Sequence, residues 1–374
     1  LAQLERLLHV DLRLAWDITP LSVPMTGIGR YTRDAILALA EVRPTWEIRL
    51  ICVAEQSGCE LAAAAFGNAP PNIEVFSVAR NPAVLTRRFA TRFGRPTIEK
   101  WVGPVDAFVD SEWFRPAQQS GKRLTVVHDL IPYRFPEWVD ARTRRAHLRA
   151  MKTLVQRVDR VIVNSHATAR DLAQFVGITE ERSSVVYPAV DSLFAAVRPA
   201  APAVAGDRPY VIAVGTTNRR KNLEVAIRAL SHCDADLALV VVGASAEAES
   251  EIVALALECG VAERVHRLGY VADAELASVM AAAQCLVFPS RFEGFGLPII
   301  EAMSAGVPVI ASSDPSLDEA CGDSAVRVDP DDIEGLADAI ASIDGSLIAS
   351  GRAHAAQFTR EWTGASVAAA IEAA

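Results

Sequence analysis

Two glutamates, Glu293 and Glu301, stand eight positions apart in the stretch PSRFEGFGLPIIEA, with two glycines and a proline between them. The apolar run CLVFPS at 285–290 predicts a buried strand before them. Pro298 suits the first turn of a helix, because the amide that proline lacks would have no partner there. A strand, a glycine turn and a helix start together predict an anion site, since helix N-termini bind phosphate.

The backbone amides of Phe295, Gly296 and Leu297 are the expected donors at this turn, because glycine lets a ligand approach the main chain. We expect Glu301 in the first turn of the helix, where its carboxylate could accept hydrogen bonds from ribose hydroxyls. Glu293 is expected in the turn itself, facing a sugar. Either glutamate alone is better explained by the helix dipole or by solvation, but the fourteen residues together favour a ligand site.

Three consecutive cations, Arg219, Arg220 and Lys221, lie in VGTTNRRKN between an expected strand end and the next helix. Fixed cations there would stabilise a leaving group that gains negative charge in the transition state. Each charge-assisted hydrogen bond to such a group contributes about 1.5–3 kcal/mol. Taken alone, a basic triplet is more often a solvated surface.

Two weaker signals come from the N-terminal half. His128 ends the apolar run RLTVVH, and a lone histidine at a strand end is more often structural than catalytic. Gly27 and Gly29 form a Gly-x-Gly turn that opens an amphipathic helix. By itself this turn indicates only helix entry.

The elements that must position these residues are apolar runs separated by helix-patterned segments. The expected strands are 10–18, 47–54, 107–110, 123–130, 160–165, 209–216, 237–243, 264–271, 285–290 and 308–313. Continuous Val/Ile/Leu runs with helices between them predict βαβ units, and therefore an α/β fold with parallel sheets covered on both faces.

The stretch RPAAPAVAGDRP has no periodicity and is typical of a linker. We therefore expect two Rossmann-like, doubly wound domains, 1–197 and 209–351, joined by a linker at 198–208 and facing a central cleft.

The bulk composition narrows the class of protein. The 374 residues contain no run of eighteen apolar residues, which argues against a membrane span, and no signal-peptide core is visible at the start. Six scattered cysteines predict neither a disulfide framework nor a zinc site. These features indicate a cytoplasmic protein.

The net charge of −9 conceals an asymmetry. Residues 77–170 carry 18 Lys/Arg against 8 Asp/Glu, whereas residues 191–374 carry 12 against 26. A basic region in an acidic protein indicates an anionic surface or substrate rather than nucleic acid. Within it, Leu85, Phe89 and Phe93 fall four apart among arginines, which is typical of a helix on an anionic membrane. A helix that packs these phenylalanines on the sheet is an equally good interpretation.

The segment FPSRFEGFGLPIIEAMSAGVPVIASS resembles the E-x7-E region of the retaining, GT-B-fold glycosyltransferases of family 4. Four other segments are similar to that family in the same order: GIGRYTRDAILALA, VVHDLIPYRFPEW, GTTNRRKNLEVAIRAL and LGYVADAELASVMAAAQCLVFPS. Bacterial mannosyltransferase-like members are the most similar. The resemblance implies that the first domain binds an acceptor, that the second binds a nucleotide sugar, and that residues 352–374 pack back on the first.

The resemblance also implies residue roles. Catalytic roles fall to Glu293, His128, Lys221 and Arg220, and donor-binding roles to Glu301, Phe295, Gly296, Leu297, Gly27, Gly29, Tyr270 and Arg219. Lys221 and Arg220 would hold the diphosphate, although many members have Gly-Arg where this chain has Gly215-Thr216.

The implied reaction transfers a hexosyl unit, foremost mannosyl from GDP-mannose, to a glycan or lipid-linked acceptor in surface polysaccharide or glycolipid synthesis. No cofactor or metal is expected, because the cations replace Mg²⁺, and contact with an anionic membrane at the inner face of the cell membrane is expected. The alternatives are a UDP-, dTDP- or GDP-deoxy-sugar donor, a sugar-nucleotide epimerase, or a non-catalytic nucleotide-sugar binder.

Overall fold

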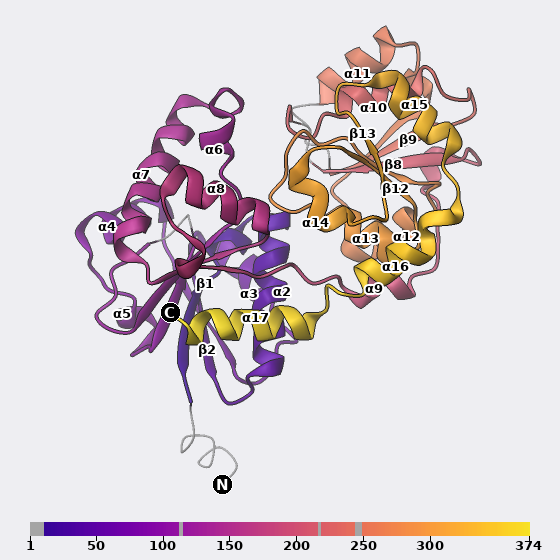
Figure 1. The fold of residues 1–374 in the computed structure, drawn as a ribbon. Coiled ribbons are helices and arrows are strands. Elements are labelled where there is room, and N and C mark those ends of the chain that lie inside the picture. Colours follow the sequence, from indigo (N-terminus) through magenta and orange to yellow (C-terminus); the bar gives the residue numbers. More distant parts are fainter. Residues whose placement is uncertain (1–10, 112–114, 216–217, 244–248) are drawn as a thin grey trace. The chain divides into compact units, whose positions relative to one another are not determined.

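The computed structural model describes residues 11–111, 115–215, 218–243 and 249–374. Its contacts divide the chain into two compact units (Figure 1). Unit 1 consists of Leu1–Ala189 and Thr359–Ala374, and unit 2 of Val190–Phe358. Each is an α/β unit with a parallel sheet, as the alternation of apolar runs and helical segments predicts.

Unit 1 holds, among its described residues, a seven-stranded sheet in the order β3-β2-β1-β4-β5-β6-β7. Its strands are β1 (Arg13–Asp17), β2 (Glu47–Ala54), β3 (Ile73–Ala79), β4 (Ala107–Asp110), β5 (Lys122–Val127), β6 (Arg160–Val163) and β7 (Ser183–Val185). Its α-helices are α2 (Gly27–Val42), α3 (Gln56–Ala64), α4 (Ala83–Phe93), α5 (Glu99–Val102), α6 (Ile131–Arg134), α7 (Ala141–Arg157), α8 (His166–Val176) and α17 (Arg360–Glu372). The short 3-10 helices are η1 (Thr19–Ser22), η2 (Pro136–Trp138) and η3 (Glu180–Arg182).

Unit 2 holds, in the part of it that is described, a six-stranded sheet in the order β10-β9-β8-β11-β12-β13. Its strands are β8 (Tyr210–Val214), β9 (Ala238–Val242), β10 (Val265–Gly269), β11 (Leu286–Phe288), β12 (Val309–Ser312) and β13 (Val326–Val328). Its α-helices are α9 (Ser192–Ala196), α10 (Leu223–Leu230), α11 (Glu249–Glu258), α12 (Asp273–Ala281), α13 (Leu297–Ala305), α14 (Asp318–Cys321), α15 (Ile333–Ser342) and α16 (Ile348–Ala355). Short 3-10 helices are η4 (Ala203–Ala205), η6 (Ala262–Arg264), η7 (Pro315–Leu317) and η8 (Gly345–Leu347).

Both sheets have the strand order of a Rossmann fold, which reverses direction beside the first strand of each unit. The reversal lies between β1 and β4 in unit 1 and between β8 and β11 in unit 2. In such sheets, ligands bind outside the carboxyl ends of the strands at this point. The fold thus selects the connections after these four strands as the places to look for a site.

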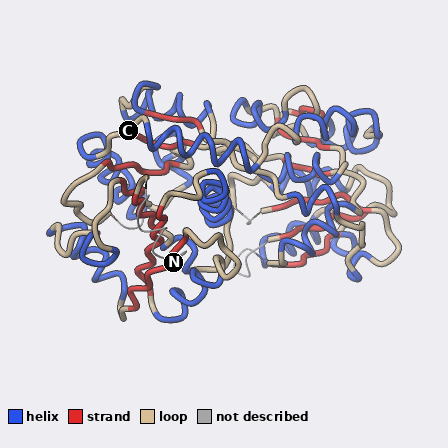
Figure 2. Tube along the Cα trace, turned by 90° about the horizontal axis from the view of Figure 1, so that it is seen from below, coloured by secondary structure: helices blue, strands red, loops and turns tan. Residues whose placement is uncertain are grey.

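The central strands are apolar because helices cover both faces of each sheet, as Figure 2 shows in the alternation of helices and strands. Strands β4 and β9 are buried along their whole lengths. The C-terminal helix α17 lies beside α2 and adds Val367 and Ile371 to the core of unit 1. A Cβ on Gly364 would stand 2.3 Å from the carbonyl oxygen of Ala38, so this close approach of the two helices requires glycine.

The unit boundaries differ from the linker expected at 198–208, which lies inside unit 2. The chain passes into unit 2 at Val190, whose amide donates to the carbonyl of Phe358 (2.9 Å), and the next helix, α9, packs on α12 and α13. Of the segment 352–374, the residues of α16 belong to unit 2 and those of α17 to unit 1.

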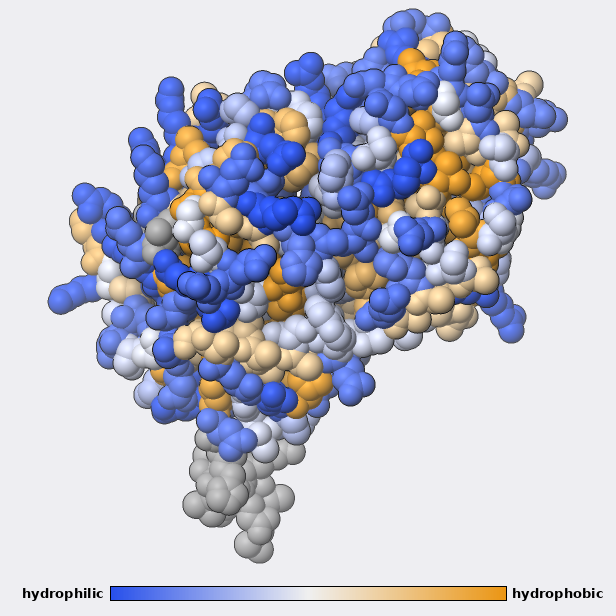
Figure 3. Space-filling view, viewed as in Figure 1, coloured by the Kyte–Doolittle hydropathy of each residue, from blue (hydrophilic) through white to orange (hydrophobic). Residues whose placement is uncertain are grey.

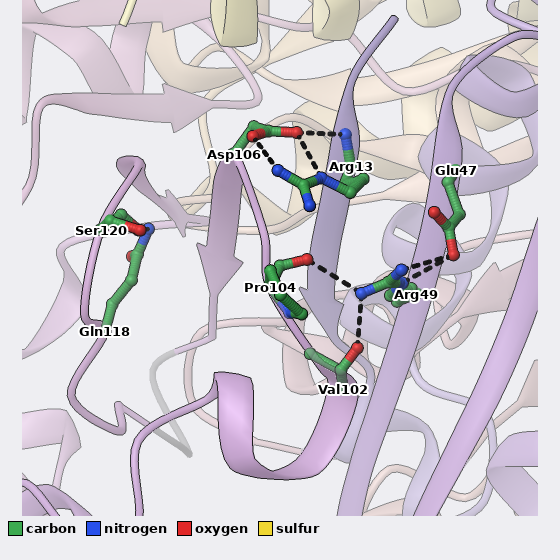
Figure 4. Close-up of polar contacts among 8 residues, drawn as sticks. All are labelled: Arg13, Glu47, Arg49, Val102, Pro104, Asp106, Gln118 and Ser120. Atoms are coloured by element: carbon green, nitrogen blue, oxygen red, sulfur yellow. Dashed lines mark hydrogen bonds and ion pairs between the residues drawn. The ribbon is translucent and has the colours of Figure 1, made fainter. Parts of the chain in front are cut away.

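Polar contacts fix the amino ends of the central strands of unit 1, the edge away from the expected ligand side (Figure 4). The guanidinium of Arg13 pairs with Asp106 at 2.8 Å, which joins β1 to the start of β4. Arg49 on β2 donates to the carbonyls of Val102 (2.7 Å) and Pro104 (2.9 Å). Within the described ranges, no helix is both long and apolar enough to cross a membrane.

Candidate active site

The connections that follow β8 and β11 are joined to each other in unit 2. The amide of Arg291 donates to the carbonyl of Arg220 at 2.8 Å. The side-chain amide of Asn222 donates to the carbonyls of Pro289 (3.2 Å) and Pro330 (2.6 Å), which also fixes the connection after β13. These bonds bring two segments about seventy residues apart in sequence to one edge of the sheet.

Asn222 was missed by the sequence reasoning, although it organises this edge. It is buried and has a φ of 54°, the left-handed conformation. Asparagine is enriched among the non-glycine residues that adopt this conformation. An asparagine directly before a helix and after a basic triplet was therefore the available signal, but its partners are set by the tertiary fold.

Lys221, Arg220 and Glu293 form an ion cluster at this edge. The Nζ of Lys221 lies 2.7 Å from Oε1 of Glu293, and the guanidinium of Arg220 pairs with Oε2 of the same carboxylate. The Lys221 ammonium also stands over the ring of Phe288, 4.6 Å from its centre. A Cβ on Gly215 would be 2.8 Å from Cε of Lys221, so glycine at the end of β8 leaves room for this side chain.

The side chains of Lys221 and Glu293 are 12% and 9% exposed, so their charges interact in a poorly hydrated environment. Burial by itself would raise the pKa of Glu293, but Lys221 and Arg220 outweigh it and hold that pKa below its usual value. Burial lowers the pKa of Lys221 and Arg220 adds to this effect, while Glu293 opposes it. Two cations share one anion, so the cluster can accept further negative charge.

Hydrogen bonds to the end of β12 and to the connection after it fix the loop that contains Glu293. The amide of Glu293 donates to Oγ of Ser316 (3.0 Å), and the amide of Ser316 donates to Asp314 (2.9 Å). The hydroxyl of Ser312 donates to the carbonyl of Ser290 at 2.5 Å. These serines were also missed, because their role depends on a strand pairing that local sequence does not encode.

Helix α13 begins at Leu297, after Gly296 with a φ of 108°, and this left-handed φ is one that glycine tolerates. The ring of Phe295 is buried and packs edge-on against Phe358, 5.4 Å between ring centres. The expectation that Glu301 lies in the first turn is wrong. It is the fifth residue of the helix, hence in the second turn, and it is 2% exposed.

The remaining candidates of unit 2 lie nearer solvent. Arg219 is exposed beside the cluster. Tyr270 is 61% exposed and follows Gly269, the last residue of β10, whose carbonyl accepts from the amide of Gly243. Thr216, where many family members have arginine, lies outside the described residues.

The candidates of unit 1 lie at the carboxyl edge of its own sheet. His128 follows β5, and its ring meets that of Tyr31 at a right angle, 5.2 Å between centres. Gly27 opens helix α2, and Oγ1 of Thr26 accepts from the amide of Gly29 (3.2 Å), an N-cap. His128 and the start of α2 are therefore joined through Tyr31.

Asp17, at the end of β1, is a further residue that the sequence reasoning missed. It is fully buried, and burial raises its pKa to about 6 against the opposing hydrogen bonds from Ser111 and Thr19. With Ser111 and His128 it lines a small cavity at the ends of β1, β4 and β5. A carboxyl with a raised pKa that lines a cavity is a candidate functional residue, but its isolated position in a short apolar run gave no signal.

Charged side chains thus meet at the reversal point of unit 2, beside a helix N-terminus. Fixed cations and helix dipoles of this kind bind phosphate groups and stabilise charge that develops on them. The described part of the chain contains no group of three or more His, Cys, Asp or Glu residues placed to hold a metal ion.

Solved structures share the two-unit architecture. Sucrose-phosphate synthase (tll1590) from Thermosynechococcus elongatus superposes with a TM-score of 0.73 at 21% identity, over 96% of this chain and 98% of that one. Anabaena Alr3699/HepE, solved with UDP and glucose, gives a TM-score of 0.71 at 18% identity, over 97% and 100%. These similarities show the GT-B fold.

Relatives by sequence are glycosyltransferases. The O-antigen chain mannosyltransferase B of Escherichia coli is 25% identical over 350 residues, 87% of this chain and 88% of the relative. The D-inositol 3-phosphate glycosyltransferase of Mycolicibacterium smegmatis is 34% identical over 220 residues, 55% of this chain and 51% of the relative. Residues 25–192 match the model of Glycosyltransferase Family 4, and residues 198–344 that of Glycosyl transferases group 1. With both units matched in this order, the chain belongs to the glycosyltransferases of family 4, with the GT-B fold.

Proposed function

We propose that this glycosyltransferase transfers a mannosyl unit from GDP-mannose to a glycan or lipid-linked acceptor, with retention of the anomeric configuration. The observation that carries the proposal is the Lys221–Arg220–Glu293 cluster at the reversal point of unit 2. Two cations beside a helix N-terminus match the needs of a nucleoside diphosphate, whose negative charge grows as it departs.

The proposed roles follow from the contacts. Lys221 and Arg220 exchange Glu293 for the diphosphate, which carries more negative charge than one carboxylate. The turn at 295–297 adds the N-terminus of α13, and Glu293, released from the cations, orients the sugar. Roles for Glu301 at the ribose and for Tyr270 and Arg219 near the base and phosphates stay predictions, as do roles for His128, Gly27 and Gly29 toward the sugar and acceptor.

The reaction needs no external base in this scheme. The acceptor oxygen attacks the anomeric carbon on the face that the diphosphate leaves, and the bond from that carbon to the phosphate oxygen breaks. The bonding electron pair stays on the phosphate oxygen, which takes up the proton of the acceptor hydroxyl. The two cations stabilise the leaving diphosphate, and each charge-assisted hydrogen bond contributes about 1.5–3 kcal/mol.

The names of the relatives support mannose as the sugar. The E. coli relative is named an O-antigen chain mannosyltransferase, and so is a Salmonella typhimurium relative, 28% identical over 220 residues. The same names support an acceptor in surface polysaccharide synthesis.

A donor panel tests the proposal. The purified chain is titrated by calorimetry with GDP-mannose, UDP-glucose, dTDP-rhamnose and ADP-glucose, and each donor is then incubated with membrane glycolipids to measure sugar transfer. We expect tight binding and transfer with GDP-mannose alone. Binding and transfer with another donor would replace the mannosyl assignment, interconversion of the sugar without acceptor would indicate an epimerase, and binding without turnover a non-catalytic binder.

A further inference from the structure

A second basic site lies within unit 1. A cavity of about 1040 Å³ opens between α4, α7 and the sheet. Nine arginines line it: Arg87, Arg88, Arg92, Arg115, Arg123, Arg142, Arg145, Arg149 and Arg157. Among its described lining residues the one carboxylate is Asp110, which pairs with Arg123 at 2.7 Å. The described lining of the cavity therefore carries a large excess of positive charge.

Helix α7 concentrates these charges on one face. Arg142, Arg145, Arg149 and Arg157 follow at intervals of three, four and eight residues, which places them on the same side of the helix. Like charges three or four residues apart destabilise a helix by about 0.2–0.5 kcal/mol per pair. Repulsion among these arginines therefore destabilises the helix unless an anion occupies the cavity.

Arg115 gives an independent sign of a missing ligand. Its Nε and Nη2 atoms are buried and have no hydrogen-bond acceptor among the described residues. A buried donor left without an acceptor costs about 1–3 kcal/mol, and more when charged. The planar guanidinium fork matches the oxygens of phosphate, which would supply the acceptors.

Helix α4 borders the cavity and exposes apolar side chains to solvent. Leu85, Phe89 and Phe93 are 58%, 54% and 63% exposed. The interpretation that this helix packs its phenylalanines on the sheet is therefore wrong; Ala83 and Ala90 face the core instead. Figure 3 shows hydrophilic side chains projecting from this side of unit 1 with smaller hydrophobic areas between them.

We propose that the arginine cavity binds the diphosphate group of a lipid-linked acceptor while the exposed face of α4 rests on the lipid surface. The proposal deepens, and rests on, the proposed function, since it names the class of acceptor. The occupant must be both strongly anionic, to match a described lining of nine arginines and one carboxylate, and attached to an apolar chain, to cover the stripe of α4. The volume exceeds what a single phosphate requires and leaves space for the first sugars of a glycan.

Vesicle binding tests the proposal on the full chain. Three preparations are compared by co-sedimentation: neutral phosphatidylcholine, phosphatidylcholine with phosphatidylglycerol, and phosphatidylcholine with a polyprenyl diphosphate at equal total charge. We expect no binding to the first and at least about tenfold tighter binding to the third than to the second, the gain of one further charge-assisted hydrogen bond. Equal binding to the two charged preparations would overturn the proposal, because general electrostatics would then explain it.

Matched variants locate the site. R145Q together with R149Q removes two lining charges, whereas R144Q together with R142Q removes two from the same helix but only one from the lining. The first pair should lose about a hundredfold in affinity for diphosphate vesicles and the second about tenfold. Equal losses would place binding elsewhere on the basic surface. Circular dichroism and melting temperature establish that the variants fold.

Phe89→Ser separates a lipid from a free phosphate. It should weaken vesicle binding severalfold but leave the affinity for soluble inorganic pyrophosphate unchanged, whereas Leu257→Ser, at an apolar residue of unit 2 that is 64% exposed, should change neither. Unchanged vesicle binding by Phe89→Ser would overturn the lipid contact. If the wild type bound a single-stranded oligonucleotide more tightly than diphosphate vesicles, the proposed class of ligand would be wrong. Nucleotide affinity is measured in parallel: its absence with intact vesicle binding would refute the proposed donor function and leave this site standing.

Discussion

Glu293→Gln should tighten the binding of nucleoside diphosphate while slowing sugar transfer. In the free protein this carboxylate neutralises one of the two cations that we propose for the diphosphate, with Nζ of Lys221 only 2.7 Å away. Removing the charge frees both cations for phosphate oxygens. The same change removes the group that is proposed to orient the sugar, so kcat should fall.

The magnitude follows from the geometry. One unit charge about 4 Å from another contributes roughly 4 kcal/mol at an effective dielectric constant near 20, and desolvation offsets most of this. We expect a net gain of about 1.4 kcal/mol, or about tenfold in Kd for GDP. Breaking a buried pair from one side is destabilising, so the variant without ligand should melt lower, and GDP should raise its melting temperature more than that of the wild type.

Calorimetry with GDP at pH 6.5, 7.5 and 8.5 is the assay. Glutamine no longer supports the protonated form of Lys221, whose pKa burial already lowers, so the gain in affinity should shrink as the pH rises. Glu301→Gln is the matched control, because it is the same isosteric change at a buried glutamate that is proposed to hold ribose. This variant should weaken GDP binding. Weaker GDP binding by Glu293→Gln across the whole pH range would refute the exchange of Glu293 for diphosphate.

Three further predictions concern Asp17 in unit 1 and two positions beside the ion cluster of unit 2. Asp17→Asn should flatten the pH dependence of stability. Because burial raises the pKa of Asp17 to about 6, ionisation of Asp17 costs the wild type about 3 kcal/mol of stability as the pH rises from about 4 to 6. Parallel profiles of melting temperature against pH for the two proteins would contradict this. Gly215→Ala should weaken GDP binding and lower the melting temperature, since the φ of 141° at this position is strained for alanine and the new Cβ would clash with Lys221. An unchanged Kd for GDP, measured by calorimetry, would exclude the clash. Asn222→Ala should destabilise unit 2 by about 2 kcal/mol through lost hydrogen bonds and backbone strain, and Asn222→Gly should destabilise it by less. Denaturant unfolding measures both changes. A larger loss of stability in Asn222→Gly than in Asn222→Ala would show that the φ of 54° carries no strain.

Much of the fold could be predicted from local patterns. The strands in the middle of each sheet are continuous apolar runs, and β9, buried along its whole length, is an example. Three edge strands, β3, β7 and β13, were not predicted. Residues of β3 are half-buried or exposed, and β7 and β13 have three residues each, so neither periodicity nor length distinguished them from loops.

The site was predictable where one short segment carries it. The turn with Glu293 and the basic triplet with Lys221 were each found from sequence, but their pairing was not, because it joins residues 72 positions apart. Asn222 and Ser316 escaped for the same reason, since each acts through contacts made only in the folded sheet. The position of Glu301 was misjudged by one turn because the helix already begins at Leu297, which makes Glu301 its fifth residue.

A pair of matched variants tests the central claim, that the cations of unit 2 hold the donor diphosphate. Lys221→Met and Arg208→Met each remove one positive charge, the first from the buried cluster and the second from an exposed residue at the amino end of β8. The affinity for GDP is measured by calorimetry at pH 7. We predict a loss of about ten- to a hundredfold for Lys221→Met and less than about threefold for Arg208→Met, since an exposed charge away from the site contributes little. Equal losses, or no loss at Lys221, would contradict the claim that this cluster is the diphosphate site.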